Sequence, residues 1–202
     1  MKIGILDYNV NNIHSVFLAV FNLGYDPILI TSAKEIKNVD KLIIPGIGNA
    51  FSSIRILKKK GYLDEIYEFT NFSRPILGIC LGLQIFCKKL LEGGMSHGIG
   101  FIDADVIKIE ESNYFNIGWN KVIIENNSFF QNKTPKEKDY YFCHSYKLKF
   151  NSEHEKKYCY GYSTNKNIPS LIVKNNFLGC QFHPEKSQKE GNSLIRIFLE
   201  KY

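Results

Sequence analysis

The sequence predicts an α/β fold in which a central, mostly parallel sheet is flanked by helices and followed by a strand-rich C-terminal half. In the first half, short apolar segments alternate with amphipathic ones. Such alternation is typical of βαβ units, whose parallel strands are covered by helices on both faces. The 202 residues suffice for a sizeable core and contain no repeat or low-complexity linker, so we expect one domain over 1–202.

The first half should contribute the parallel strands and most of the helices. We expect strands at Lys2–Leu6, Ile28–Thr31, Lys41–Ile44 and Pro75–Ile79. Helical periodicity predicts helices at Asn12–Leu23, Asn49–Lys60, Tyr62–Asn71 and Leu81–Leu91. Ser32 and Glu35 have the spacing of a capping box, which predicts a short helix between the second and third strands. Ligand sites lie beyond the carboxyl ends of such strands, which directs attention to the residues after Ile44 and Ile79.

The second half is richer in strands. Strand-like segments occur at Ala104–Ile109, Lys121–Ile124, Tyr140–Phe150, Tyr158–Tyr162, Ser170–Val173 and Phe177–Phe182. A closing helix is expected from about Lys189 to Lys201, because apolar residues recur there at helical spacing. Asn126–Asp139 is polar and lysine-rich, and we expect a mobile loop.

Composition favours a cytoplasmic protein. The five cysteines are odd in number and lack metal-type spacing, which favours a reducing compartment over a disulfide framework. We expect no signal peptide and no membrane segment, because no apolar run approaches the roughly 20 residues that a membrane helix needs. The net charge of +6 comes mainly from scattered lysines, and no nucleic-acid-binding motif accompanies them. We therefore expect no nucleic-acid partner.

Cys80 lies in the most informative segment, Gly78-Ile79-Cys80-Leu81-Gly82. A strand, a sharp turn flanked by glycines and a helix form a nucleophile elbow, here with cysteine in place of serine. Glycines are needed on both sides because the turn residue is strained and a neighbouring Cβ would clash. The helix that follows offers N–H groups and a positive dipole end, which favour a thiolate. The alternative is a buried core cysteine.

His183 and Glu185 can supply the base and its orienting group. Phe177–Phe182 has the pattern of a strand that Pro184 ends, and Gln181 and His183 share one face of it. Glu185 is close enough to hold one imidazole nitrogen and leave the other free to accept a proton. Two alternatives are a surface turn and a metal site of His183, Glu185 and His144, although no metal-ligand spacing supports the latter.

Further segments complete a recognisable series. In chain order they are Pro45-Gly46-Ile47-Gly48, the Cys80 elbow through Gln84, Gly118-Trp119-Asn120, Tyr141 through Tyr146, and Gln181 through Ser187. With these segments the chain resembles the class I (triad-type) glutamine amidotransferases, whose fold is flavodoxin-like. Within that family it is most similar to the glutaminase subunits of imidazole glycerol phosphate synthase, and the similarity covers essentially the whole chain.

The resemblance implies that glutamine is the substrate and that no cofactor or metal is used. Its catalytic triad would be Cys80, His183 and Glu185. Backbone N–H groups of Leu81 and of Ile47 or Gly48 would form the oxyanion hole. The alternative for Pro45–Gly48 is a simple turn. Substrate-binding residues would be Gly46, Gln84, His144 and Ser145.

The resemblance also implies a partner. In this family, ammonia passes to a (βα)8-barrel cyclase subunit that makes imidazole glycerol phosphate and the purine precursor AICAR. Residues matching Trp119, Tyr141 and Lys186 lie at or near the face that meets the barrel. Core packing is the alternative for each, most of all for Tyr141. Where relatives often carry histidine, the chain has Phe115-Asn116-Ile117, and Asn49 follows the Pro-Gly-Ile-Gly loop.

Other functions remain open at this point. A paralogous glutaminase could supply ammonia to a surface-sugar amidotransferase, and a catalytically silent subunit could serve as a regulatory partner. A cysteine hydrolase of peptides is a further alternative that lacks its local signature here. Cys143 has no glycine turn behind it and is rejected as a nucleophile, and Cys87 is expected to pack within a helix.

Overall fold

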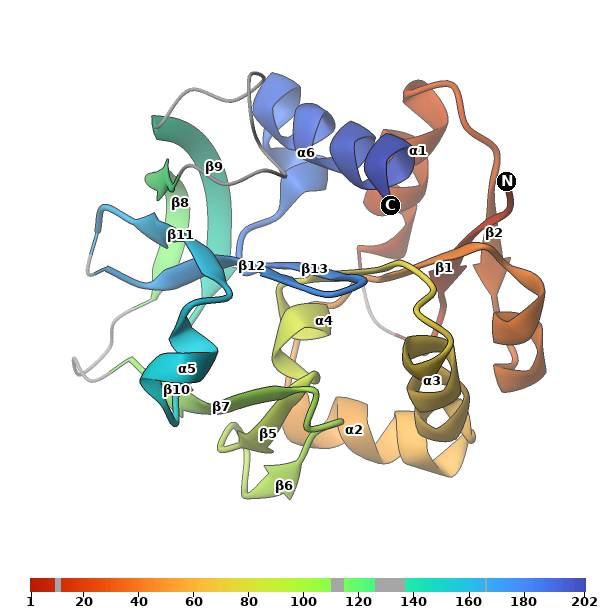
Figure 1. Ribbon diagram of the computed structural model, residues 1–202, viewed down its shortest axis with the longest axis horizontal. Helices are drawn as coiled ribbons and strands as arrows, with labels where there is room; N and C mark the ends of the chain where they lie inside the picture. Colours follow the sequence, from red (N-terminus) through yellow and green to blue (C-terminus); the bar gives the residue numbers. More distant parts are fainter. Residues whose placement is uncertain (10–11, 110–114, 126–136, 166) are drawn as a thin grey trace.

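The computed structural model describes residues 1–9, 12–109, 115–125, 137–165 and 167–202. Across these residues the main sheet has the strand order β2-β1-β3-β4-β13-β12-β11-β8-β9 (Figure 1). Its strands are β1 (Ile3–Leu6), β2 (Pro27–Ile30), β3 (Lys41–Ile44), β4 (Ile76–Ile79), β8 (Asn116–Ile124), β9 (Glu137–His144), β11 (Cys159–Ser163), β12 (Pro169–Lys174) and β13 (Phe177–Cys180).

The strands from β2 to β13 in this order are parallel, and the strands from β12 to β9 extend the sheet in antiparallel fashion. This arrangement confirms the expected α/β fold and its strand-rich C-terminal half. It also places the carboxyl ends of β3, β4 and β13 at one edge of the sheet, because parallel neighbours point the same way. The predicted nucleophile follows β4 and the predicted base follows β13.

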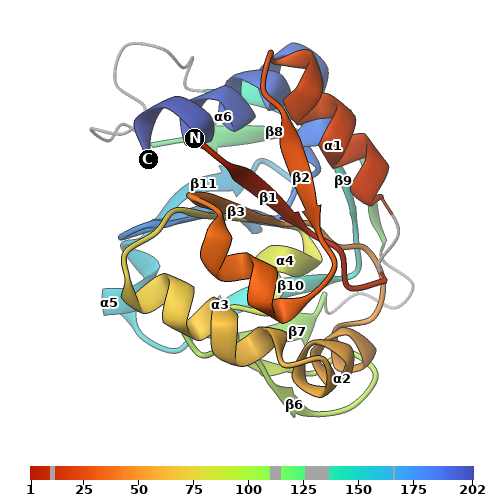
Figure 2. The ribbon, with the colours of Figure 1, turned by 90° about the vertical axis from the view of Figure 1, so that its right-hand side faces the viewer.

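Helices cover both faces of the sheet. They are α1 (Ile13–Asn22), α2 (Ala50–Lys59), α3 (Tyr62–Asn71), α4 (Leu81–Gln84), α5 (Glu153–Lys156), α6 (Gln188–Lys201) and the 3₁₀ segments η1 (Ala33–Asn38) and η2 (Pro184–Lys186). Figure 2 shows α1 and α6 on one face and α2 and α3 on the other. Ile5 packs with Val16 and Phe198 on the first face, and Leu6 packs with Leu57 on the second, as the alternation of a strand requires.

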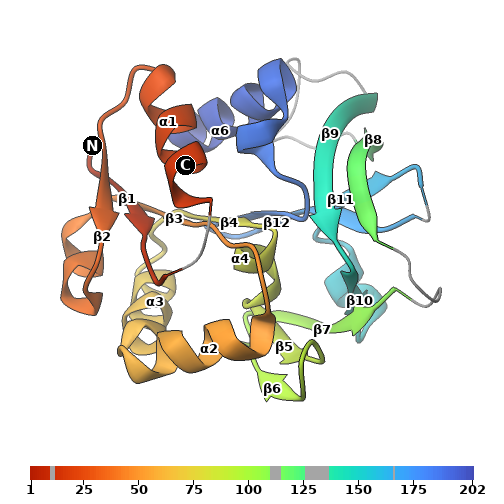
Figure 3. The same cartoon turned by 180° about the vertical axis from the view of Figure 1, so that it is seen from behind.

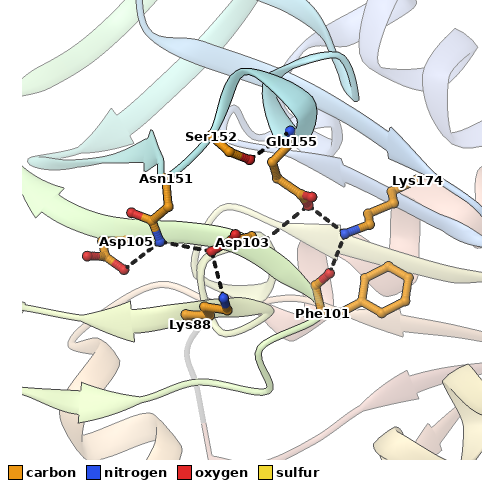
Figure 4. A network of polar contacts seen from close by, with 8 residues as sticks. All are labelled: Lys88, Phe101, Asp103, Asp105, Asn151, Ser152, Glu155 and Lys174. Carbon is orange, nitrogen blue, oxygen red and sulfur yellow. Dashed lines mark hydrogen bonds and ion pairs between the residues drawn. The ribbon is translucent and has the colours of Figure 1, made fainter.

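A smaller sheet lies beneath α4 and beside α2. Its order is β10-β7-β5-β6, from β5 (Cys87–Leu90), β6 (Ser96–His97), β7 (Ile102–Lys108) and β10 (Tyr146–Phe150). A polar network ties this sheet to α5 and β12 (Figure 4). Lys174 of β12 forms an ion pair with Glu155 of α5 at 2.5 Å and donates to the Phe101 carbonyl. Both partners of the pair are largely buried, so the network holds the two sheets together.

The predicted helix Leu81–Leu91 is wrong in its second half. Helix α4 ends at Gln84, and β5 begins at Cys87, so Cys87 packs within a strand and not within a helix. Residues 83–87 are all buried and, apart from Gln84, apolar, so they show no exposed polar face. Such a run does not distinguish a helix from a buried strand by periodicity, which explains the error.

Two strand predictions also need correction. The predicted strand Tyr140–Phe150 is interrupted at Ser145, and its two parts, β9 and β10, belong to different sheets. Strand β8 begins at Asn116 and not at Lys121, so the Gly-Trp-Asn segment is part of a strand. Of the predicted loop Asn126–Asp139, residues 126–136 lie outside the described residues, and Glu137–Asp139 belong to β9.

The other predicted elements agree with the structure to within a few residues. The capping box of Ser32 and Glu35 is present at the start of η1, because the Glu35 carboxylate accepts the Ser32 N–H at 2.9 Å. Within the described ranges, no helix is long and apolar enough to cross a membrane.

Candidate active site

Cys80 occupies a strained turn between β4 and α4. Its φ of 52° and ψ of −104° lie in a region that residues with a side chain rarely adopt. A Cβ on Gly82 would lie 1.8 Å from the carbonyl oxygen of Ile44, and one on Gly78 would lie 2.8 Å from that of Gly82. The flanking glycines are therefore required by close backbone approach, as expected for a nucleophile elbow.

The helix after Cys80 is shorter than expected. Since α4 has only 4 residues, its dipole is weaker than that of the predicted helix. The sulfur is instead approached by a side-chain donor, because Nε2 of Gln181 lies 3.6 Å from Sγ of Cys80. Gln181 is fully buried. This buried amide is one polar group that the structure offers to a thiolate.

His183 and Glu185 are in direct contact. Nδ1 of His183 lies 2.8 Å from Oε1 of Glu185, and both side chains are fully buried. The 3₁₀ turn η2 brings Glu185 back beside His183, and Nδ2 of Asn12 donates to the same Oε1 at 2.5 Å. Because Nδ1 bonds to the carboxylate, Nε2 is the nitrogen available for chemistry. No described residue provides Nε2 with a hydrogen bond of good geometry.

The surroundings of His183 favour its charged form. Burial lowers the pKa of His183, but the Cys80 sulfur and the Glu185 carboxylate together raise the pKa to about 10. The imidazole therefore carries a proton at neutral pH. A positively charged imidazole beside a cysteine sulfur is the electrostatic setting in which cysteines act as nucleophiles.

A pocket opens beside Cys80 with a volume of about 180 Å³. Its lining residues are Ile47, Gly48, Cys80, Leu81, Gln84, Glu92, Cys143, His144, Ser145 and Tyr146. These residues come from the loop after β3, from the elbow, from the residues after β5 and from the β9–β10 connection. The pocket thus brings together most of the residues that the sequence singled out. Within the described ranges, no group of three or more histidine, cysteine or acidic residues could hold a metal ion.

Nearly the whole chain matches a known protein family. A family model described as "Glutamine amidotransferase class-I" matches residues 5–202. The chain belongs to this family.

Named relatives of this amidotransferase support the assignment. "Imidazole glycerol phosphate synthase subunit HisH" of Caldanaerobacter subterraneus subsp. tengcongensis is 39% identical over 201 residues, which cover 98% of this chain and 97% of the relative. The protein of the same name from Lactococcus lactis is 35% identical, with 98% of each chain covered. The one from Buchnera aphidicola subsp. Acyrthosiphon pisum is 34% identical and is covered over its whole length.

Solved structures agree with the amidotransferase fold. A "Crystal structure of glutamine amidotransferase" has a TM-score of 0.77 at 17% identity and covers 98% of this chain and 97% of its own. "Structure of PurLQS from Thermotoga maritima" has a TM-score of 0.79 at 16% identity, with the same coverage of both chains. At these identities the likeness concerns the fold alone.

The residues expected to form the amidotransferase oxyanion hole all line the pocket. Ile47, Gly48 and Leu81 line the pocket beside Cys80, and Gly48 has a φ of 116°. Gly46, expected to bind substrate, lies behind them: a Cβ on it would meet the Tyr8 hydroxyl at 2.6 Å and Leu81 Cβ at 2.9 Å. Gly46 therefore lets the loop after β3 pack against the elbow.

Of the expected substrate-binding residues, Gln84, His144 and Ser145 line the pocket. Gln84 is buried, and its Nε2 donates to Oε1 of Gln181 at 3.1 Å. The His144 side chain is buried as well, and burial lowers its pKa to about 4, so the ring is neutral. Cys143 precedes it on β9, is exposed and also lines the pocket.

Three polar residues at the site were missed by the sequence analysis: Asn12, Glu92 and Gln181. Glu92 lines the pocket, its Oε2 accepts the Ala50 N–H at 2.9 Å, and burial raises its pKa. Ending the predicted helix at Gln84 would have placed Glu92 after a strand, near the site. Gln181 could have been found from the strand face that it shares with His183. Nothing in the sequence marked Asn12.

The residues expected to meet a partner form one surface cluster on β8, β9 and η2. Trp119 is 49% exposed and is the register partner of Tyr141, with the two rings edge to face at 6.1 Å. Nζ of Lys186 lies 5.8 Å from the centre of the Tyr141 ring. Phe115 and Ile117 are also exposed beside them. Tyr141 is half-buried and lies in this cluster.

Proposed function

We propose that this chain is the glutaminase subunit of imidazole glycerol phosphate synthase in histidine biosynthesis. It hydrolyses glutamine to glutamate and ammonia and passes the ammonia to a (βα)8-barrel cyclase subunit. The observation that carries this proposal is the buried contact between His183 and Glu185 beside a cysteine held in a strained turn. The identity to the HisH relatives over nearly the whole chain supports the choice of synthase.

The chemistry follows from the positions of the three side chains. The Cys80 thiolate attacks the carboxamide carbon of glutamine, and backbone N–H groups of Leu81 and of Ile47 or Gly48 receive the oxyanion. His183, protonated at Nε2, gives that proton to the departing nitrogen, so the C–N bond breaks and ammonia leaves. Neutral His183 then accepts a proton from water as the water attacks the thioester, which releases glutamate and restores Cys80.

Glutamine recognition would use the polar groups of the pocket. The Glu92 carboxylate is suited to the α-ammonium group of the substrate, because a buried charge is stabilised by an opposite one. His144 is neutral and buried, so its part in binding is the position of its main chain and that of Ser145. Gln84 would act from the pocket wall and Gly46 from behind it.

The partner would bind at the cluster of Trp119, Tyr141 and Lys186. Aromatic residues that are half-exposed and ordered by ring contacts are common anchors of protein interfaces. Lys186 directly follows the triad carboxylate, so a cyclase bound there would contact the catalytic segment. The five free cysteines suit the reducing cytoplasm, where we place the protein. The family match over 5–202 supports the proposal of a single domain.

The test is glutamine hydrolysis by the purified chain with the barrel cyclase of its own genome, with and without the nucleotide ligand of the cyclase. We expect hydrolysis that the ligand stimulates and that is absent in Cys80→Ala. Complex formation without hydrolysis would indicate a catalytically silent subunit. Lack of binding to the cyclase, with binding to a surface-sugar amidotransferase, would assign the ammonia to that acceptor.

A further inference from the structure

A row of side chains joined by hydrogen bonds begins on β8, beneath the exposed cluster of Trp119, Tyr141 and Lys186. Nδ2 of Asn120 donates to Oδ1 of Asn116 at 2.7 Å. Nδ2 of Asn116 lies 2.8 Å from Nε2 of His144, its register partner on β9. Nδ1 of His144 lies 2.7 Å from the carbonyl oxygen of Tyr146. Asn116 and His144 are both buried, so these bonds are shielded from water.

The direction of hydrogen-bond donation along this row is fixed by the Tyr146 carbonyl at one end. A carbonyl oxygen only accepts, so Nδ1 of His144 carries a hydrogen. The ring is neutral, so its Nε2 must accept, and Asn116 must present its NH₂ group to it. Oδ1 of Asn116 then faces Asn120, which donates. Each group has a single allowed orientation, and reversing one member would reverse its neighbours.

A second row of hydrogen-bonded side chains leads from the Tyr146 carbonyl to Cys80. Nε2 of Gln84 donates to the Tyr146 carbonyl at 3.3 Å and to Oε1 of Gln181 at 3.1 Å. Nε2 of Gln181 in turn points at Sγ of Cys80, 3.6 Å away. The Tyr146 carbonyl oxygen therefore accepts hydrogen bonds from both rows of side chains.

The row of hydrogen-bonded side chains begins at Asn120, which lies where the proposed partner would bind. Side chains alternate along β8, so Asn116 and Asn120 point inward while Ile117 and Trp119 point outward. Figure 3 shows β8 and β9 side by side at the edge of the main sheet, with β10 continuing toward the smaller sheet. A displacement of β8 moves both asparagines with it, because they share its backbone.

We propose that Asn116 and Asn120 are positioning residues that fix which nitrogen of His144 carries the proton, and through the Tyr146 carbonyl set the Gln84–Gln181 pair that faces the Cys80 sulfur. The inference rests on the proposed glutaminase function and adds a route by which a partner on Trp119 acts on the nucleophile. Neither asparagine is among the residues that line the pocket beside Cys80.

Two substitutions at one position separate this role from simple packing. Asn120→Asp replaces a donor by an acceptor, so Asn116 must rotate and present its oxygen to His144. Nε2 of His144 then carries a proton, and the ring either becomes charged or loses its bond to Tyr146. Asn120→Ala removes the donor without forcing the Asn116 amide to rotate. The matched control is Asn175→Asp, at an exposed turn position with a φ of 51° that aspartate tolerates.

The first measurement is the kcat and KM for glutamine of the complex with the cyclase. We expect Asn120→Asp to lower kcat by about tenfold and Asn120→Ala by at most about threefold, consistent with coupling of one to two hydrogen bonds. Asn175→Asp should match the wild type, and KM should change little in all three. Equal losses in Asn120→Asp and Asn120→Ala would overturn the proposal.

The second measurement is the ¹⁵N NMR spectrum of the histidine rings in the free chain, with His144→Gln used for assignment. We expect hydrogen on Nδ1 and none on Nε2 of His144 in the wild type, and hydrogen on Nε2 in Asn120→Asp. A wild-type ring with hydrogen on Nε2 would overturn the proposal. This readout needs no turnover, so it decides the inference even where the complex fails to hydrolyse glutamine, which would count against the proposed function alone.

Discussion

Asn12 and His183 bind the same oxygen of Glu185. The two residues are far apart in the sequence, yet Nδ2 of Asn12 lies 2.5 Å and Nδ1 of His183 lies 2.8 Å from Oε1. Oε2 of Glu185 is buried and has no hydrogen-bond partner among the described residues. The carboxylate is thus held by one oxygen, and Asn12 is the neutral donor that fixes its orientation toward the imidazole.

Removing the Asn12 side chain should lower kcat. Asn12 has a φ of 81° and makes no capping bond with its side chain, so Asn12→Gly deletes the donor without strain. We expect kcat for glutamine to fall by about tenfold and the free energy of unfolding to fall by about 1.5 kcal/mol, since a hydrogen bond to a charged group contributes about that much. Asn12→Asp should be worse, because it places a second carboxylate at Glu185. An Asn12→Gly enzyme with wild-type kcat would contradict this role.

The stability contributed by His183 should depend on pH. Its pKa is raised from 6.5 to about 10 in the folded chain by Cys80 and Glu185 acting against burial. A raised pKa stabilises the fold fully below the unfolded value and loses that effect as pH rises toward the folded value. The difference in free energy of unfolding between wild type and His183→Gln should therefore shrink between pH 7 and 10. Urea unfolding at three pH values measures it, and a difference that grows with pH would refute the assignment.

Glu92→Gln tests the proposed recognition of the substrate ammonium group. Glutamine at this position can still accept the Ala50 N–H, so the start of α2 should be kept. We expect KM for glutamine to rise by about tenfold or more while kcat changes little, because the lost interaction is made equally in ground and transition states. Steady-state kinetics at saturating cyclase provide the measurement. An unchanged KM would show that the ammonium group binds elsewhere.

Gly82→Ala should prevent the elbow from closing. The added Cβ would overlap the Ile44 carbonyl, so strand β3 and the elbow would have to separate. We expect a loss of more than about 3 kcal/mol in the free energy of unfolding, or insoluble protein. The control is Gly24→Ala, where nothing lies within 4 Å and only the φ of 91° is unfavourable. That variant should lose about 1 kcal/mol, as urea unfolding would show.

Glu155→Gln should destabilise the junction between the two sheets. It removes one charge of a pair whose side chains are only 16% and 6% exposed, and it leaves Lys174 without its counter-charge. We expect a loss of about 3 kcal/mol in the free energy of unfolding. The exposed pair Arg196–Glu200 is the control, and Glu200→Gln should cost less than about 0.5 kcal/mol. Equal effects in both variants would mean that burial of the Glu155 pair has no energetic consequence.

Local patterns predicted much of this molecule. The strands that lead to Cys80 and His183 could be recognised because each is a short apolar run ended by a turn residue. The elbow glycines are demanded by steric contact, so they are visible in one sequence. The contact of His183 with Glu185 needs only a tight turn, and a spacing of two residues already suggests it.

What the sequence could not provide is register and the path of buried runs. Asn116 meets His144 only because β8 and β9 pair in one particular register, which a single sequence does not specify. The segment from Leu83 to Cys87 is apolar except for Gln84 and is buried throughout, so it lacks the exposed polar face that would have revealed the end of α4. Glu92 was lost from the predicted site for the same reason.

The break between strands β9 and β10 at Ser145 has a mechanical consequence. Here the backbone leaves the main sheet with β9 and enters the smaller sheet with β10, and the two residues flanking the break line the glutamine pocket. The pocket therefore lies on the seam between two hydrogen-bonded bodies. A small rotation of one body against the other would widen or narrow the opening for glutamine while every ladder bond within each sheet stays intact.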